Sequence, residues 1–301
     1  MYEQYYGLSE KPFSLTPDTD FFYQSITHQE ALNVLLVAIR SGDGFIKVTG
    51  EVGTGKTLIC RKLLDALDTE YNTVYIPNPY MSCNALLDAV VAEMGISDKL
   101  DKENYLACIN EYLIDSARQS KTTVIILDEA QSLPEESLEA IRLLSNLETE
   151  KKKLVQIILF GQPELDEKLG RSSIRQLQQR IMHAYQLKPL NQSSINAYIH
   201  HRIRSAGYTG PELFDAAAQS LLFKISHGVP RVINVLCNKA MMLSYASGDF
   251  HVHKSHIEAA ALDSKVSVPA QSSSGHSHHY GRQIAMLSLV IAAVFMAGSF
   301  Q

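Results

Sequence analysis

The segment that most constrains the fold is residues 50–57, Gly-Glu-Val-Gly-Thr-Gly-Lys-Thr, which fits the phosphate-loop pattern GxxxxGK[ST] at every fixed position. An apolar stretch at 44–50 precedes it and predicts a buried strand, while residues 57–67 show the apolar spacing of a helix. Glycines let the backbone N–H groups approach a phosphate chain, and the helix that follows offers its positive N-terminus. We therefore expect ATP to be bound by the whole loop, with Lys56 at the β- and γ-phosphates and Thr57 on Mg²⁺: Gly50, Glu51, Val52, Gly53, Thr54, Gly55, Lys56 and Thr57.

A second motif ends the long apolar run at 122–130, TTVIILDEA. A carboxylate at the carboxyl end of a buried parallel strand lies near the phosphate crevice. Asp128 is accordingly predicted to share Mg²⁺ with Thr57, and Glu129 to act as the general base for the attacking water. The alternative is an ordinary acidic cap of the next segment.

The order of the remaining segments predicts an α/β fold, a P-loop parallel sheet with helices on both faces. Continuous Val, Ile and Leu runs predict strands that are buried on both faces. These runs lie at 44–50, 72–79, 122–130, 154–161 and 183–187, with helices expected at 57–67, 83–94 and 105–119. After Pro189 only helices are expected, at 193–206, 211–226, 231–246 and 253–264. The predicted domains are an ATPase core at 1–190, a helical lid at 191–265, a linker at 266–282 and a hydrophobic helix at 283–300.

The C-terminal part is predicted to reach a membrane. Residues 284–300 contain no charge, and 17 residues of helix rise about 26 Å, at the short end of what spans a bilayer. We prefer this interpretation to a buried C-terminal helix because no polar stripe is present. Arg282 weakly favours a cytoplasmic N-terminal side. Since no signal peptide opens the chain, we expect the part before this run to stay in the cytoplasm.

The composition argues against some classes of partner and bound group. The net charge of −5 argues against a dedicated nucleic-acid binder. Four widely spaced cysteines (Cys60, Cys83, Cys108 and Cys237) predict reduced thiols, because disulfide frameworks and zinc sites need clustered spacing. The histidines at 276, 278 and 279 are interpreted as part of a solvated tether and not as a metal site.

Taken together, the motifs resemble the AAA+ ATPases, and within them the general secretion pathway protein A group. The likeness covers roughly residues 1–262 and extends to the ATPases of mannose-sensitive haemagglutinin (MSHA) pilus biogenesis. It is carried by LSEKPFSLTPDTDFFY near the start, HQEAL at 28–32, YIPNP at 75–79, DEAQSL at 128–133, LSNLETEKKKLVQIILFGQPEL at 144–165 and GVPRVINVLCNKAM at 228–241.

The resemblance implies roles for four further side chains. Gln162 occupies the sensor 1 position, where a polar group orients the lytic water or contacts the γ-phosphate. Arg180 stands where relatives carry an arginine finger that reaches a neighbouring subunit, with Arg175 as the fallback. Arg231 of GVPR is similar to sensor 2, which couples ATP to the lid. The alternatives are a turn residue for Gln162 and a solvated helix arginine for Arg180 or Arg175.

The resemblance also implies that an N-terminal stretch covers the adenine of ATP, around Phe13, Thr16, Pro17 and Phe22. The alternative is that these residues only pack in the core, which accounts for their types nearly as well. General secretion pathway protein A carries a peptidoglycan-binding module beyond its membrane helix. We do not expect that module here, because the sequence ends at Gln301.

The function expected from all this is an oligomeric ATPase that converts ATP to ADP and phosphate at the inner membrane. Its implied partners are further copies of itself and proteins of type IV (MSHA-like) pilus or type II secretion assembly. The alternatives are a DNA-associated transposition or replication ATPase, which the acidic charge and apolar tail disfavour, and a nucleotide-dependent scaffold without hydrolysis, which an intact Glu129 disfavours.

Overall fold

The computed structural model describes residues 2–96, 105–148 and 153–264, all of which lie within one compact unit. Five parallel strands form its sheet in the order β2-β3-β4-β1-β5. Their bounds are β1 Phe45–Gly50, β2 Tyr71–Ile76, β3 Thr122–Leu127, β4 Val155–Gly161 and β5 Ile181–Leu187. The five strands predicted from the apolar runs are thus confirmed, and their carboxyl ends meet at one edge of the sheet.

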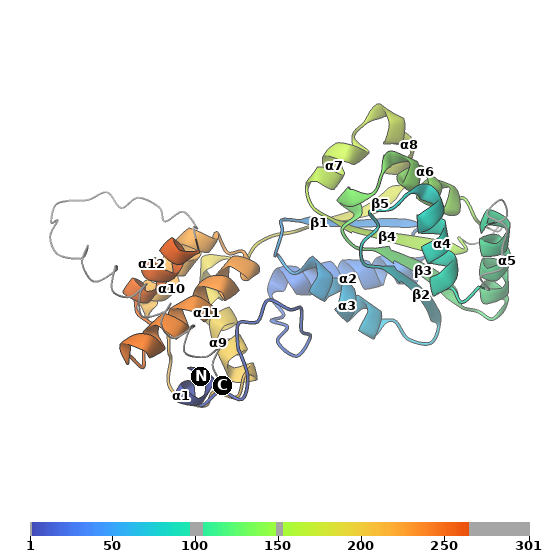
Figure 1. Cartoon of the computed structure of the whole chain (residues 1–301). Coiled ribbons are helices and arrows are strands. Elements are labelled where there is room, and N and C mark those ends of the chain that lie inside the picture. Colours follow the sequence, from blue (N-terminus) through green and yellow to red (C-terminus); the bar gives the residue numbers. More distant parts are fainter. Residues whose placement is uncertain (1, 97–104, 149–152, 265–301) are drawn as a thin grey trace, which may run out of the picture. The chain divides into compact units, whose positions relative to one another are not determined.

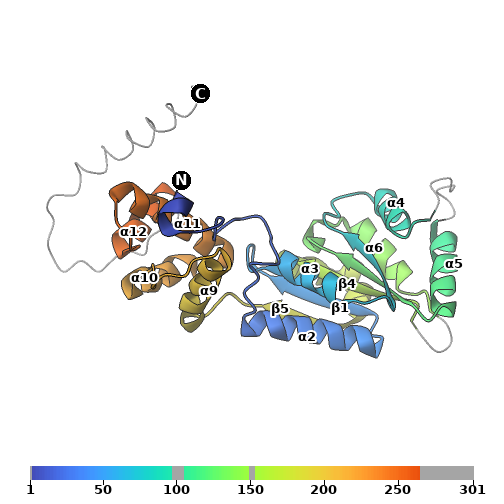
Figure 2. The same ribbon diagram turned by 90° about the horizontal axis from the view of Figure 1, so that it is seen from below.

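Both faces of this sheet are covered (Figure 1). Val124 and Ile126 of β3 pack in the same apolar cluster as α2 and α3, whereas Ile125 and Leu127 pack with α4, α5, α6 and α7. Because side chains alternate along a strand, every strand needs apolar residues on both faces, which explains the continuous runs. Figure 2 shows α2 and α3 on their face. The helices of the sheet region are α2 Ile26–Ser41, α3 Lys56–Ala66, α4 Cys83–Glu93, α5 Tyr105–Arg118, α6 Glu135–Leu144, α7 Glu164–Leu169 and α8 Arg175–Gln178.

Several of these helices were not predicted. The longest of them is α2, whose start is fixed by Ser25, because the Ser25 side chain accepts a hydrogen bond from the His28 backbone N–H. The others, α6, α7 and α8, are helices of ten residues or fewer in a stretch of mixed polar character. Conversely, the helix expected at 211–226 begins only at Ala216, where Asp215 caps it. Phe214 ahead of it instead forms an isolated bridge with Val252.

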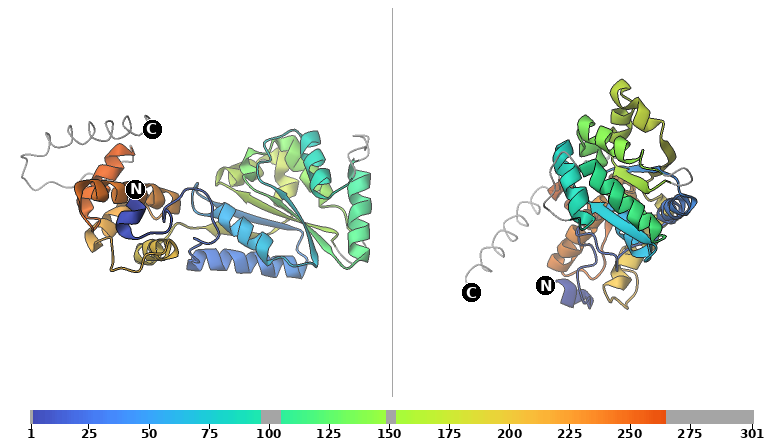
Figure 3. Two further views of the ribbon diagram at one scale, coloured as in Figure 1. Left: turned by 60° about the horizontal axis from the view of Figure 1, so that its bottom comes forward. Right: turned by 90° about the vertical axis from the view of Figure 1, so that its right-hand side faces the viewer.

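Four helices follow the sheet and build a second apolar core: α9 Gln192–Ser205, α10 Ala216–Ser226, α11 Pro230–Ser247 and α12 Lys254–Asp263. The N-terminal residues join this lid core, not the sheet. Tyr2 and Tyr6 of α1 (Tyr2–Tyr6) are buried there, as are Phe13 and Phe21. Figure 3 shows α1 beside α11, where the Tyr2 hydroxyl donates to Asn238 Oδ1 at 2.7 Å.

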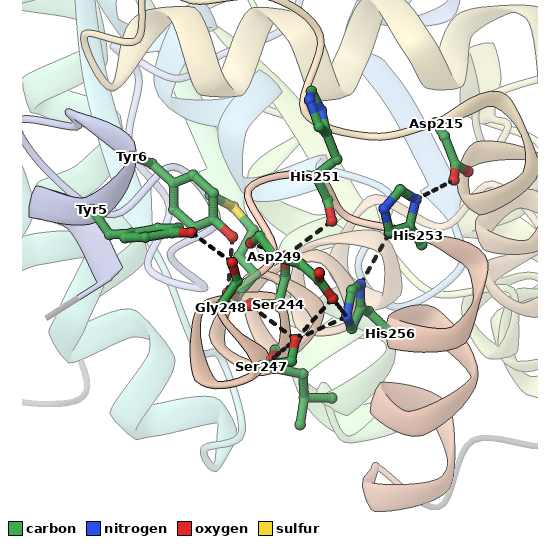
Figure 4. Close-up of polar contacts among 12 residues, drawn as sticks. Tyr5, Tyr6, Asp215, Ser244, Ser247, Gly248, Asp249, His251, His253 and His256 are labelled. Carbon is green, nitrogen blue, oxygen red and sulfur yellow. Dashed lines mark hydrogen bonds and ion pairs between the residues drawn. The ribbon is translucent and has the colours of Figure 1, made fainter.

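Two histidines at the start of α12 make polar contacts with neighbouring residues (Figure 4). His253 Nδ1 lies 2.8 Å from Asp215 Oδ2, and His256 Nε2 lies 3.2 Å from Asp249 Oδ2. The His253 backbone N–H donates to His256 Nδ1 at 3.0 Å. Nowhere in the described residues are three or more His, Cys, Asp or Glu grouped to hold a metal, and the histidines at 276, 278 and 279 lie outside them.

The hydrophobic run at 284–300 and the linker before it also lie outside the described residues. Across the ranges that the structure describes, no helix is long and apolar enough to cross a membrane. The four cysteines are free: Cys60 and Cys237 are buried, and Cys83 and Cys108 are partly exposed.

Candidate nucleotide site

The phosphate loop connects β1 to α3 and depends on two glycines with left-handed backbone. Gly53 has φ 82° and Gly55 has φ 102°. A Cβ on Gly55 would lie 2.7 Å from His28 Nε2, and one on Gly53 would lie 2.4 Å from Cβ of Arg231. Only glycine meets both the backbone and the packing requirement at these positions.

Lys56 is the first residue of α3, and its side chain is folded back into the loop. Its Nζ donates to the carbonyl oxygens of Gly50 at 2.8 Å and Glu51 at 3.1 Å, and the residue is only 4% exposed. Burial lowers the pKa of Lys56, while the negative charges of Glu129 and Asp128 act against that shift. The loop therefore holds the Lys56 amino group at its centre, bound to two backbone carbonyl oxygens.

The Thr57 hydroxyl and Asp128 face each other where β3 ends. Thr57 Oγ1 donates to Asp128 Oδ2 at 2.8 Å. Burial raises the pKa of Asp128, and the hydrogen bonds from Thr57 and from the backbone N–H of Glu129 oppose this rise. A hydroxyl and a carboxylate are hard oxygen donors of the kind that Mg²⁺ takes, so the pair predicted for the metal fits it.

Glu129 has a left-handed backbone at φ 54°, which is unusual for a residue with a Cβ. Its Oε2 accepts two amide hydrogen bonds, from Gln131 Nε2 at 2.6 Å and from Gln162 Nε2 at 3.0 Å. Burial raises the pKa of Glu129, but these two hydrogen bonds and the charge of Lys56 together leave it below its usual value. Glu129 and Gln162, predicted separately, are thus in direct contact.

A cavity of about 280 Å³ extends from the loop toward the N-terminal segment and the lid. Its walls come from four regions: the loop and α3 with Val52, Gly53, Thr54, Gly55, Lys56, Thr57 and Leu58; Glu129; the N-terminal part with Ser14, Leu15, Thr16, Pro17, Asp18, Phe21, Phe22, Tyr23 and His28; and the lid with Tyr198, Arg202, Pro230, Arg231 and Asn234. Thr16, Pro17 and Phe22 lie where the adenine cover was expected. Phe13 does not, because it is buried in the lid core with its ring 6.1 Å from that of Phe214.

Arg202 of α9 shapes this cavity, although sequence reasoning did not single it out. It is 3% exposed, and its guanidinium donates to the carbonyl oxygens of Pro12 at 2.6 Å and Ser14 at 3.2 Å. The same group lies 4.7 Å from the centroid of the Phe21 ring. One lid side chain therefore fixes the N-terminal segment that walls the cavity.

The three predicted arginines have different surroundings. Arg231, near the start of α11, lines the cavity, and its backbone N–H donates to the Gly53 carbonyl oxygen at 3.2 Å. Arg180 and Arg175 do not line it. Arg180 Nη1 donates to Ser145 Oγ at 2.8 Å, whereas Arg175 is exposed at the start of α8.

Two more residues of the site were missed although their segments had been noted. His28 stands in the HQEAL segment, and its Nε2 lies 2.9 Å from the Thr54 carbonyl oxygen in the phosphate loop. Gln131 stands in DEAQSL beside the predicted base. No local pattern marks Arg202, since its partners are about 190 positions away along the chain.

Comparison with known proteins agrees with this geometry. The model of the AAA domain family matches residues 39–169. General secretion pathway protein A of Aeromonas hydrophila is 40% identical over 267 residues, which cover 87% of this chain and 48% of that protein, so the chain spans about half the length of this curated relative.

Solved structures share the fold at low sequence identity. Cdc6p from Pyrobaculum aerophilum superimposes with a TM-score of 0.65 at 16% identity, covering 84% of this chain and 70% of that one. Drosophila ORC bound to DNA gives 0.60 at 18% identity, with coverage of 96% and 74%. Residues 39–169 thus match an AAA domain, and the chain is similar to general secretion pathway protein A over most of its own length.

Proposed function

We propose that the protein is a Mg²⁺-dependent ATPase whose hydrolysis drives the assembly of a secretion or type IV (MSHA-like) pilus complex at the bacterial inner membrane. The observation that carries the ATPase part is the convergence of Lys56, Thr57, Asp128, Glu129 and Gln162 at one edge of the sheet. These residues come from three strand ends, and in a parallel sheet that edge is where ligands bind.

The binding roles follow from the donors present. Lys56 presents its ammonium to the β- and γ-phosphates from the centre of the loop, beside the N-terminus of α3. Thr57 and Asp128 would hold Mg²⁺, which when bound would neutralise negative charge on the phosphates.

The hydrolytic role falls to Glu129. A carboxylate kept ionised by amide donors accepts a proton from a water that attacks the γ-phosphate. Gln162, directly after β4, donates to that carboxylate, and we assign it the sensor role that the resemblance implies. An exchange of Glu129 for an uncharged isostere removes the proton acceptor but leaves the phosphate loop intact.

This separation gives the test. ATP turnover and ATP affinity are measured for the parent and for Glu129→Gln. We expect turnover to fall by roughly 10²–10⁴-fold, the usual contribution of a general base, with affinity within about twofold of the parent. Hydrolysis by Glu129→Gln at the parental rate would remove the assigned role. A parent that binds ATP without turnover would instead support the scaffold alternative.

We further propose that the working form is a homo-oligomer in which an arginine of one copy completes the site of the next. Arg180 remains the predicted finger and Arg175 its alternative. Arg175 is exposed, while Arg180 donates to Ser145 of its own chain. Arg180→Ala and Arg175→Ala are compared under assembling conditions. The finger is the residue whose loss slows turnover without changing ATP affinity, and normal turnover in both variants would contradict the proposal.

The location and partners rest on the relative in the general secretion pathway and on the apolar run at 284–300. Deleting 283–301 should release the protein from membranes washed with carbonate, whereas a retained protein would exclude this run as the anchor. Crosslinking at the membrane with and without ATP, followed by identification of the neighbours, tests the pilus or secretion partners. Salt-dependent retention on DNA would favour the transposition or replication alternative.

A further inference from the structure

Gln131 lies between the proposed base and the strand that carries Gln162. It is the middle residue of a short 3-10 helix, Ala130–Ser132, which follows the Asp128-Glu129 pair directly. Its side-chain amide makes contacts at both ends: Nε2 donates to Glu129 Oε2 at 2.6 Å, and Oε1 accepts from the backbone N–H of Gln162 at 3.0 Å.

The chemistry of these partners fixes the orientation of the amide. A backbone N–H can only donate, so the Gln131 atom that faces Gln162 has to be the oxygen. The Nε2 group is then directed at Glu129, and a flipped amide would place two acceptors against each other. The position of Gln131 is also held from the main chain, because Lys168 Nζ donates to the carbonyl oxygens of Gln131 at 2.6 Å and Leu133 at 2.7 Å.

Glu129, Gln131 and Gln162 therefore form a closed circuit of hydrogen bonds. Gln162 contacts Glu129 with its own amide at 3.0 Å and contacts Gln131 with its backbone. Both amide donors meet the same carboxylate oxygen, Oε2. Within the described residues no hydrogen bond reaches the other oxygen, Oε1, and Glu129 lines the nucleotide cavity. The circuit holds one oxygen and leaves the second available to a water.

We infer that Gln131 is a positioning residue for hydrolysis: its amide holds Glu129 by one oxygen and ties this base to the end of β4, so that the orientation of the base follows Gln162. This inference rests on the proposed ATPase function and deepens it. Gln131 does not line the cavity, so its effect on the reaction passes through Glu129.

Two substitutions of Gln131 separate the donor from the acceptor. Gln131→Leu removes both contacts. Gln131→Glu keeps the length of the side chain and an oxygen for the Gln162 N–H, but it replaces the donor to Glu129 with a second carboxylate oxygen. Gln119→Leu, at an exposed position after α5, is the matched control for the substitution itself.

We expect both Gln131 variants to lower kcat about tenfold or more, a fraction of the roughly 10²–10⁴ that a general base contributes, with the Kd for ADP unchanged within about twofold. Added to Glu129→Gln, Gln131→Leu should change the residual single-turnover rate by less than about twofold, because residues that act as one unit are not additive. The control should match the parent.

A readout without nucleotide completes the test. In amide NMR spectra of the nucleotide-free protein, Glu129→Ala should shift the side-chain NH₂ signal of Gln131, which is identified by its loss in Gln131→Leu. The inference is overturned by a parental kcat in both Gln131 variants, by an equal slowing of the parent and of Glu129→Gln, or by an unshifted signal. A parent that turns over ATP no faster than Glu129→Gln would overturn the proposed function itself, and the inference with it.

Discussion

The two ends of the nucleotide cavity are built in different ways. At the phosphate end, the contacts come from residues 50–57 and from Asp128 and Glu129, two short segments that follow β1 and β3, the strands on either side of β4. At the opposite end, the walls come from the N-terminal segment and from α9 and α11. Arg202 of α9 is hydrogen-bonded to the N-terminal segment.

This difference separates two sources of specificity. Under the proposed function, the phosphate end recognises the charged phosphate chain with backbone N–H groups and a lysine, and every nucleoside triphosphate carries that chain. The opposite end touches the lid, so occupancy there bears on the position of α9 and α11. On the proposed function, we expect the first end to supply affinity and the second to couple the adenine base to the lid. Inorganic tripolyphosphate, which has no base, tests the first end alone.

The largest effect on ligand affinity is expected from Lys56→Met. Loss of hydrogen bonds to a charged group costs about 1.5–3 kcal/mol, or roughly 10–100-fold in affinity. Because this change affects the phosphate end, affinities for ATP and tripolyphosphate should fall together in a calorimetric titration. Lys224→Met, at an exposed lysine of α10, is the matched control. If tripolyphosphate binding were unaffected, Lys56 would not be the phosphate contact.

Arg202→Met should affect the opposite end. The carbonyl oxygens of Pro12 and Ser14 lose their donor, so the N-terminal wall loosens. We expect ATP affinity to fall about tenfold, corresponding to about 1.4 kcal/mol, while tripolyphosphate affinity stays within about twofold. Arg204→Met is a close control, since Arg204 is also on α9 and donates to two backbone carbonyls, those of Tyr208 and Gly210, away from the cavity. Equal losses for both ligands would contradict the division of the cavity into two ends.

Gly53→Ala tests the contact between the loop and the lid. Alanine at φ 82° is strained, and its Cβ would also collide with Arg231. Gly248→Ala, at φ 77° with nothing within 4 Å, carries the backbone strain alone, which costs about 1–2 kcal/mol. The free energy of unfolding, measured in urea, should fall by about 1 kcal/mol more for Gly53→Ala, within the range for overpacking. Equal losses would mean that Arg231 moves aside freely.

The same comparison explains what could be predicted from the sequence. Lys56 and Thr57 were identified because a strand, a loop and a helix in order already fix their neighbours, and Asp128 because it directly follows a long apolar strand. Gln162 needed the resemblance, since only the order of strands in the sheet brings β4 beside β3. Arg202 could not be found, because its role depends on residues near the N-terminus that pack in the lid. For the same reason Phe13 was placed by the cavity when it belongs to the lid core.

The smallest effect is expected on the pH dependence of stability, from His28, which lines the cavity between its phosphate end and its opposite end. Its Nε2 contacts the Thr54 carbonyl oxygen and its Nδ1 lies 2.5 Å from Ser25 Oγ, so the neutral ring uses both nitrogens. Burial lowers the pKa of His28, against the opposing effect of the Thr54 carbonyl. Below the unfolded pKa of about 6.5, the unfolded chain therefore binds a proton at His28 more readily than the folded protein does, and the free energy of unfolding falls as the pH drops.

The melting temperature of His28→Gln should fall less than that of the parent between pH 7 and pH 5. Because His201 and His256 also have pKa values lowered by burial and are present in both proteins, the difference between the two curves isolates His28. Parallel curves would show that the contact with Thr54 does not depend on the neutral ring.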